Sequence, residues 1–449
     1  MNATALVIRH AIFPLWTLKN RSARLKYLAQ LERSQYWSRE RLLEHQWSSF
    51  RRLVAHAFET CPFYRRSFER AGITPDDLRS PEDVAKVPMI TKEDIQAHRE
   101  EMVSSRYRRE ALIRDMTGGS TGSPMQFYYD ADRRDSREAA AMRHDRWAGW
   151  DLGERRAILW GAPQDTRIDA GLKSRLRERL IERRLILDAA SLDEEAMSRF
   201  ARELLRYRPG TLLAYANTLG LFARYLRDQG IEAIRPRGII SSAEVLTPEN
   251  RQLVEEVFSC RVFDRYGSRE FGLIASECEA HCGMHVNAEN LLVEAVVDGT
   301  PRVDEDGEIV VTDLRNYAMP MIRYRIRDVG RITGRVCECG RGLPLMELSG
   351  GRVTDFLTAT DGRKVSGIVV ATYVITNIPG IRQVQFVQDT PGAVTINLVR
   401  GGEWSAETQR ELISRARRYL GEDMQFELSF RDRIPAEKSG KYRFCISKL

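Results

Sequence analysis

The 449-residue sequence lacks any apolar run long enough to cross a bilayer, although 43% of its residues are hydrophobic. Arg9 and His10 interrupt the apolar stretch within residues 1–19, and no small-residue cleavage site follows it, so it is not typical of a signal peptide. A docking helix and a weak contact with a membrane surface stay open for this stretch, and we favour packing against the domain. We therefore expect a cytoplasmic protein without a transmembrane segment.

The sequence also lacks internal repeats, low-complexity tracts and nucleic-acid-binding motifs, so we expect no nucleic-acid partner. The formal net charge is +7, with an arginine-rich basic side that suits a nucleotide or another polyanionic ligand. A solvated surface with an arginine bias explains the same surplus equally well. Seven cysteines, an odd and unevenly spaced set, favour metal binding over disulfide bonds.

The length suits two or three domains, and the local patterns change twice along the chain. Residues 1–110 read as helices, with a break at Pro62, and residues 111–350 alternate short β-rich runs with helical stretches, as βαβ units do. Residues 286–333 read as strands alone, and residues 351–449 as a small α+β unit. We predict an α/β fold: a large domain with mostly parallel sheets and a β subdomain, followed by a small mobile C-terminal domain.

A glycine- and hydroxyl-rich segment, residues 117–124, has the sequence Thr-Gly-Gly-Ser-Thr-Gly-Ser-Pro. Its backbone N–H groups and hydroxyls can approach phosphate closely because the side chains are small. The segment lacks the Gly-Lys-Ser/Thr ending of a Walker loop. A flexible linker is the alternative interpretation.

Two further segments lie at the ends of predicted strands. Residues 266–270 follow one strand, at the end where ligands bind in α/β sheets, and residues 323–328 form a strand that Asp328 ends, with its arginines on one face. Residues 266–270, Tyr-Gly-Ser-Arg-Glu, offer an aromatic ring for a base and a carboxylate for Mg²⁺, although a solvated turn is the simpler interpretation. Residues 323–328 place three arginines at alternating positions before Asp328, whose carboxylate can accept both hydroxyls of a ribose. Such arginines suit anions, or local acidic residues on an exposed strand face.

Three further candidates remain: a segment at the boundary before residues 351–449, a lysine near the end of the sequence, and a group of cysteines and histidines. Residues 350–355 combine glycines with charged residues, as an interdomain hinge does, and Lys441 follows a glycine and can place its charge on a phosphate. Cys278 and His285, with Cys337 and Cys339, can form a closed tetrahedral zinc site, for which Cys282 and His281 are spare ligands. Buried free cysteines are the alternative.

These segments, in this order, resemble the adenylate-forming superfamily of acyl-CoA synthetases, and within it the phenylacetate–CoA ligase branch with its capsule-biosynthesis relatives. The resemblance covers residues 47–443, nearly the whole chain. It departs from the family at Met125, where a lysine is usual, and at Arg269, where a threonine is usual. Arg269 is therefore the candidate for the contact with the α-phosphate.

The resemblance implies a role for each matching position. ATP would be bound by Thr117, Gly118, Gly119, Ser120, Thr121, Gly122, Ala243, Glu244, Tyr266, Gly267, Ser268, Asp328 and Arg352. Glu270 would hold Mg²⁺, Lys441 and Arg269 would act with it in catalysis, and Asp355 would be the hinge. The acyl pocket would lie among Trp160, Tyr215, Asn217, Ser241 and Ser242, and the cysteine–histidine zinc site would be structural.

The implied reaction activates a small-molecule carboxylic acid. Attack of the carboxylate on the α-phosphorus of ATP releases pyrophosphate and leaves an acyl-adenylate, which a thiol, coenzyme A first among them, then attacks. An amine, a sugar or a carrier protein is the alternative acceptor, and a non-catalytic scaffold on the same fold is a third hypothesis. A homodimer stays open.

Overall fold

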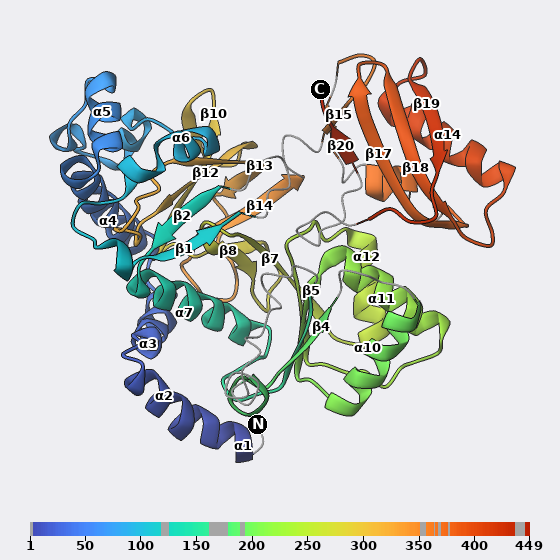
Figure 1. Ribbon diagram of the computed structural model, residues 1–449, viewed down its shortest axis with the longest axis horizontal. Helices are drawn as coiled ribbons and strands as arrows, with labels where there is room; N and C mark the ends of the chain where they lie inside the picture. The colour runs from blue at the N-terminus through green and yellow to red at the C-terminus, as the bar shows by residue number, and fades with distance from the viewer. Residues whose placement is uncertain are drawn as a thin grey trace.

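The computed structural model describes residues 3–117, 125–160, 178–188, 194–350, 356–362, 364–366, 370–375, 378–435 and 445–449. The described chain forms a twelve-stranded mixed sheet with helices around it and a separate four-stranded C-terminal sheet (Figure 1). This arrangement confirms the predicted α/β class. Within the described residues, no helix is both long and apolar enough to cross a membrane.

Helices dominate the chain before residue 112. Ser38 and Thr91 cap α4 and α6 through their side-chain oxygens, and Pro62 begins α5 directly after α4 ends, at the predicted break. Pro81 begins a 3₁₀ helix. The elements are α1 (Ala3–Val7), η1 (Ile8–Ile12), α2 (Phe13–Lys19), α3 (Arg24–Ser34), α4 (Arg39–Thr60), α5 (Pro62–Ala71), η2 (Pro75–Asp77), η3 (Pro81–Lys86), α6 (Lys92–Met102) and η4 (Arg109–Ala111).

Five parallel strands, in the order β4-β3-β5-β6-β7, form one side of the large sheet. Three amphipathic helices bury Phe200, Phe222 and Phe258 against them in a continuous apolar core. The predicted βαβ pattern therefore holds here. The elements are β3 (Arg156–Trp160), η5 (Glu178–Glu182), β4 (Arg184–Asp188), α10 (Glu194–Tyr207), β5 (Thr211–Tyr215), α11 (Ala216–Asp228), β6 (Gly238–Ser242), α12 (Pro248–Phe258) and β7 (Arg261–Ser268).

The strand-only region continues the same sheet, because β7 pairs in parallel with β6 and antiparallel with β8. The order then runs β8-β9-β14-β13-β12-β10-β11, all antiparallel. The strands are β8 (Gly272–Glu277), β9 (Met284–Val286), β10 (Leu291–Val297), β11 (Thr300–Arg302), β12 (Gly307–Asp313), β13 (Tyr324–Thr333) and β14 (Leu345–Gly350). One strand thus joins the parallel half to the β region.

A hairpin and a helix lie over this junction. The hairpin is β1 (Ile113–Met116) with β2 (Gln126–Tyr129), and α7 (Ala131–Trp147) follows it, capped by the Asp130 carboxylate. The helix α7 is mostly polar, yet it buries Arg133, Arg143 and Asp145. Each of these charges meets an opposite charge from a strand or from the turn after one.

The C-terminal residues build their own core around Phe386, Ile396 and Leu412. The strand order is β19-β18-β17-β20, with α14 packed against the sheet. The elements are β15 (Phe356–Thr358), β16 (Lys364–Ser366), η7 (Val370–Ile375), β17 (Ile381–Thr390), β18 (Ala393–Arg400), α14 (Ala406–Leu420), β19 (Gln425–Phe430) and β20 (Cys445–Ser447). Figure 1 draws this unit in orange and red, beside the large sheet.

The three arginines before Asp328 face protein carboxylates, which was the simpler of the two explanations. Arg323 is fully buried, precedes β13 and makes two hydrogen bonds to Glu294, at 3.2 and 3.0 Å. Its third nitrogen donates to the carbonyls of residues 85 and 87. Arg325 and Arg327 are exposed and pair with Glu308 and Glu93. Their charges are therefore matched within the protein.

We predict that Glu294→Gln destabilises the large domain by about 3 kcal/mol, because Arg323 stays buried after losing its counter-charge. Urea unfolding followed by circular dichroism measures the loss. Arg325→Met, at an exposed pair, is the matched control and should cost less than about 1 kcal/mol. Equal shifts in the two variants would contradict the assignment.

Candidate functional site

The Tyr266 hydroxyl donates a 2.7 Å hydrogen bond to the Asp328 carboxylate. These two residues belong to β7 and β13, which three strands separate in the pairing order of the sheet. The sheet must therefore curl so that the end of β7 faces β13. Two segments predicted independently, 266–270 and 323–328, consequently meet at one place.

The turn from β7 to β8 is tight. A Cβ on Gly267 would lie 2.5 Å from the carbonyl oxygen of Gly272, so that position requires glycine. Gly272 has φ +73°, which also favours glycine, and the Phe271 N–H donates to the Ser268 hydroxyl. The turn presents Arg269 and Glu270 at its tip, both partly buried.

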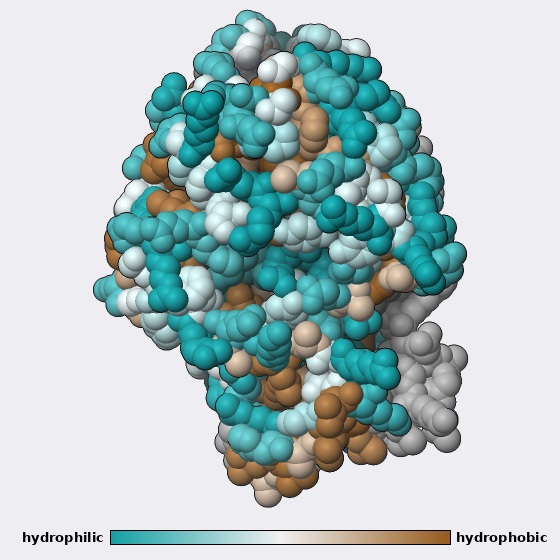
Figure 2. Space-filling model, turned by 90° about the vertical axis from the view of Figure 1, so that its left-hand side faces the viewer, coloured by the Kyte–Doolittle hydropathy of each residue, from teal (hydrophilic) through white to brown (hydrophobic). Residues whose placement is uncertain are grey.

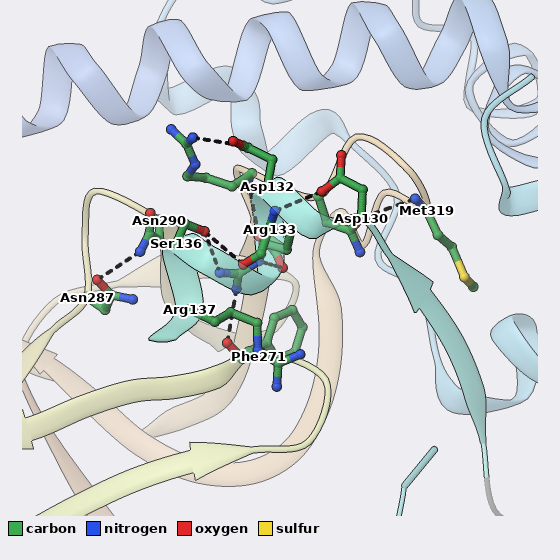
Figure 3. Close-up of polar contacts among 12 residues, drawn as sticks. Asp130, Asp132, Arg133, Ser136, Arg137, Phe271, Asn287, Asn290 and Met319 are labelled. Atoms are coloured by element: carbon green, nitrogen blue, oxygen red, sulfur yellow. Dashed lines mark hydrogen bonds and ion pairs between the residues drawn. The ribbon is translucent and has the colours of Figure 1, made fainter. Parts of the chain in front are cut away.

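Two arginines one turn apart on α7 hold this turn, and Figure 3 shows Arg133 and Arg137 beside Phe271. The Arg133 guanidinium donates to the Phe271 carbonyl at 3.0 Å, and that of Arg137 donates to the Arg269 carbonyl at 2.8 Å. Arg133 also pairs with Asp313 at 2.6 Å, and the Arg137 guanidinium lies over the Tyr129 ring, 5.0 Å from its centre. Both carbonyls of the turn are therefore fixed by charged donors from one helix.

The base of the glycine-rich segment lies beside the same turn. The Thr117 N–H donates to the Met125 carbonyl, and the Met125 N–H donates to the Thr117 hydroxyl, both at 2.9 Å. Asp115, on the strand leading into the segment, faces the Arg269 guanidinium at 3.6 Å. The described part of the hairpin therefore lies beside Arg269. Gly118, Gly119, Ser120, Thr121 and Gly122 lie outside the described residues.

The turn after β6 contains Ala243 and Glu244, which were predicted to line the adenine. Ala243 adopts φ +68°, a left-handed conformation that costs a residue with a Cβ about 1 kcal/mol. Such conformations persist where surrounding structure fixes them, often at functional sites. The turn lies at the carboxyl end of β6, beside β7 and its Tyr266.

The residues predicted for the acyl pocket lie on two faces of the parallel strands. The rings of Trp160 and Tyr215 are 4.0 Å apart between centres, and Ser242 pairs with Tyr215 in the strand register. Ser241 lies on the opposite face, as strand alternation requires, and its buried hydroxyl has no hydrogen-bond partner among the described residues. Asn217 lies in the first turn of α11, and its side chain is outside the described part of the structure.

Asp264 is a titratable residue that the sequence analysis missed. Burial, together with the neighbouring Glu277 carboxylate, raises the pKa of its carboxyl to about 7. Glu277 itself accepts the Asp264 N–H and pairs with Arg251 and His281. The sequence pattern of β7 does not indicate a raised pKa at Asp264, because the neighbouring carboxylate comes from β8, the strand that pairs beside it.

Cys278, His285, Cys337 and Cys339 come together between β8, β9 and the segment before β14, with their ligand atoms within 4.8 Å of one another. The Cys278–Cys337 sulfur distance is 3.6 Å, and the distance from the Cys339 sulfur to His285 Nε2 is 3.3 Å. Tetrahedral zinc would require about 3.8 and 3.5 Å for these edges.

His285 is oriented for such a role, since its Nδ1 donates to the Leu343 carbonyl at 3.1 Å and leaves Nε2 toward the cysteines. Burial lowers the pKa of His285 to about 4, so its ring is neutral. The spare candidates are engaged elsewhere: His281 pairs with Glu277, and the Cys282 thiol donates to the Ala280 carbonyl. Arg352, Asp355 and Lys441 lie outside the described residues.

With a curled sheet, a glycine-rich hairpin and a separate C-terminal sheet, the chain has the fold of adenylate-forming enzymes. It superposes on 2-hydroxyisobutyryl-CoA ligase in the postadenylation state with a TM-score of 0.72, over 90% of this chain and 89% of that one, at 20% identity. A likeness at this identity shows the fold.

Homologues of the chain are Protein CapK and phenylacetate–coenzyme A ligases, which confirms the resemblance predicted from the sequence. Protein CapK of Staphylococcus aureus is 24% identical over 420 residues, covering 91% of this chain and 90% of that protein. The phenylacetate–coenzyme A ligase of Escherichia coli is 28% identical over 315 residues, covering 68% and 69%. Residues 357–448 match the family model described as the CapK C-terminal domain.

We predict that Arg137→Met loosens the turn between β7 and β8. Losing a charged donor to the Arg269 carbonyl should make the amides of residues 268–272 exchange with solvent about tenfold faster, since one such bond contributes roughly 1.5 kcal/mol. Hydrogen–deuterium exchange of this peptide measures the change. Arg134→Met, which removes a pair with Asp135 on the same helix, is the control, and equal exchange in the two variants would contradict the clamp.

Proposed function

We propose that the chain activates a carboxylic acid with ATP, releasing pyrophosphate, and passes the acyl group to a thiol, coenzyme A being the first candidate. The homologous phenylacetate–coenzyme A ligases and the fold of an acyl-CoA ligase with a bound acyl-AMP support this reaction. The single observation that carries the proposal is the Tyr266–Asp328 contact, because it unites an aromatic face and a carboxylate as a nucleoside requires.

In the proposed complex, adenine lies against the Tyr266 ring and beside Ala243 and Glu244. Asp328 accepts the ribose hydroxyls, and its hydrogen bond from Tyr266 keeps the carboxylate oriented before the nucleotide binds. Arg352 assists at the ribose. Ordering these groups in advance lowers the entropic cost of binding.

The triphosphate lies along the glycine-rich hairpin, from Thr117 to Gly122, and reaches the turn at Gly267 and Ser268. The Arg269 guanidinium lies beside the hairpin through its 3.6 Å contact with Asp115, which supports a role on the α-phosphate. The Glu270 carboxylate is suited to bind Mg²⁺, since it is partly buried and lies on a rigid turn. Mg²⁺ would neutralise charge on the phosphates when bound.

The acid would enter beside Trp160, Tyr215 and Ser242, at the carboxyl ends of β3, β5 and β6. Asn217 would lie at the same end, and the buried Ser241 hydroxyl is on the other face of the sheet, so we place it behind the pocket wall. The remaining steps depend on residues 351–449 as a small domain that turns about Asp355 and carries Lys441 to the reacting phosphate.

An amine, a sugar or a carrier-protein thiol is the alternative acceptor. The two candidates share the adenylation step and differ only in the attacking group. Replacing coenzyme A by each acceptor after adenylation separates them.

We predict exchange of labelled pyrophosphate into ATP, dependent on one class of carboxylic acid from a panel of aryl, fatty and amino acids. Lys441→Ala should slow this exchange roughly 100- to 1000-fold, as expected for the loss of one positioned charge on the transition state. Lys448→Ala, which removes a surface lysine paired with Asp389 in the same domain, is the matched control. Absence of exchange with every acid, or equal rates for both variants, would refute the proposal.

We further propose that Cys278, His285, Cys337 and Cys339 hold a structural Zn²⁺ ion. Three thiolates and one imidazole complete a tetrahedron, which leaves no coordination position open for substrate. The ion would tie the segment before β14 to β8 and β9, and so support the strands that adjoin Tyr266.

We predict about one equivalent of zinc in protein purified without a histidine tag. Cys337→Ser should lose the ion and lower Tm by at least about 3 °C, because the link between the strands is broken. Cys282→Ser should keep both, since this thiol donates to a backbone carbonyl outside the cluster. Less than half an equivalent of zinc in the parent protein would argue for free buried cysteines.

A further inference from the structure

The helical segment formed by α1, η1 and α2, residues 3–19, is apolar on two faces. One face buries Ile8 and Phe13 in a small core with residues of α3 and α7, and Ala5 is buried on the same segment. This packing is the arrangement that we favoured from the sequence. It fixes the segment on the large domain and determines which side faces outward.

The outward face remains apolar. Leu6, Val7, Ile12, Leu15 and Leu18 are 43%, 53%, 38%, 65% and 76% exposed. Of the thirteen exposed large hydrophobic side chains among the described residues, five lie on this one segment. Figure 2 shows brown side chains gathered at the lower end of the molecule, where Figure 1 has α1 and α2. Clustering of this kind marks an interaction surface.

The charged residues of the segment itself and of the start of α3 have one sign. Residues 1–31 contain five lysines and arginines and no aspartate or glutamate. Arg9 and Arg24 pair with Asp151 and Glu138 of the domain. Lys19, Arg21 and Lys26 are exposed where the segment ends and α3 begins, next to Leu18.

We propose that this face, named the 3–19 face, lies in the surface of an anionic membrane. Its leucines would enter the boundary between headgroups and acyl chains, while Lys19, Arg21 and Lys26 would contact lipid phosphates. A helical segment of 17 residues extends about 25 Å and can lie flat in that plane. The lipid surface fits better than a protein partner, because it matches both the row of exposed apolar side chains and the exposed basic residues Lys19, Arg21 and Lys26 beside them. The inference does not depend on the proposed ligase activity.

Vesicle sedimentation of the full chain tests the proposal. We expect binding to vesicles of equal parts phosphatidylcholine and phosphatidylglycerol, weaker binding to phosphatidylcholine alone, and loss of the difference at high salt, where the screening length falls to about 3 Å. Leu15→Glu/Leu18→Glu should reduce the bound fraction at least about tenfold on either vesicle. Lys19→Glu/Arg21→Glu should cause a similar loss on the anionic vesicles only.

Leu43→Glu/Val303→Glu is the matched control, since these side chains are 47% and 52% exposed elsewhere on the surface. Circular dichroism of each variant checks folding, and Leu18→Ser gives a milder change at the most exposed position of the 3–19 face. Wild-type protein that stays in the supernatant with both vesicles overturns the proposal. So does a dimer in light scattering that Leu15→Glu/Leu18→Glu dissociates without any vesicle binding, because the 3–19 face would then join two copies of the chain.

Discussion

The buried charges of α7 constrain the rest of the large domain. Arg133 pairs with Asp313, Arg143 with Glu289, and Asp145 with Arg156 and Arg265. Burial alone would raise the pKa of Asp145, but the two guanidinium groups outweigh it and hold that pKa below its usual value. Removing one partner of such a pair costs about 3–5 kcal/mol, so the helix and the strands must be placed together.

Because of these pairs, α7 determines the position of elements that are far apart in the sequence. Asp313 ends β12, Glu289 follows β9, Arg156 begins β3 and Arg265 lies on β7. The helix therefore contacts both the parallel and the antiparallel half of the sheet at the point where the sheet curls. That curl brings Tyr266 to Asp328, and the arginines of the same helix fix the turn beyond Tyr266.

Local patterns in the sequence predicted the parallel strands, their helices and the helix break at Pro62, because propensity and hydrophobic period act over short distances. They also predicted which segments carry the candidate site, through glycine spacing and the order of motifs. They could not predict α7 as a buried element, since its sequence has the composition of an exposed polar helix. Its burial depends on counter-charges more than a hundred residues away, as with Arg133 and Asp313.

The same limitation applies to the arginines before Asp328. Alternation along a strand predicted a shared face, but Arg323 precedes β13 with φ +50° and is buried against Glu294. Whether such an arginine is buried or exposed depends on its ionic partner, and the partner of Arg323 is Glu294 on β10. By contrast, the cysteine–histidine cluster could be predicted, because two short spacings already limit which atoms can meet and metal geometry supplies the rest.

The helix α7 also joins the 3–19 face to the candidate site. One side of α7 shares a small apolar core with Ile8 and Phe13, and its Asp135 accepts the Ala23 N–H at 2.7 Å. Its other side donates to the carbonyls of Arg269 and Phe271. A rigid, charge-matched helix between the two means that a surface docked on residues 3–19 would hold the turn of Arg269 and Glu270 at a fixed height above that surface. The entrance of substrate would then be oriented by the fold itself, without any change in the site.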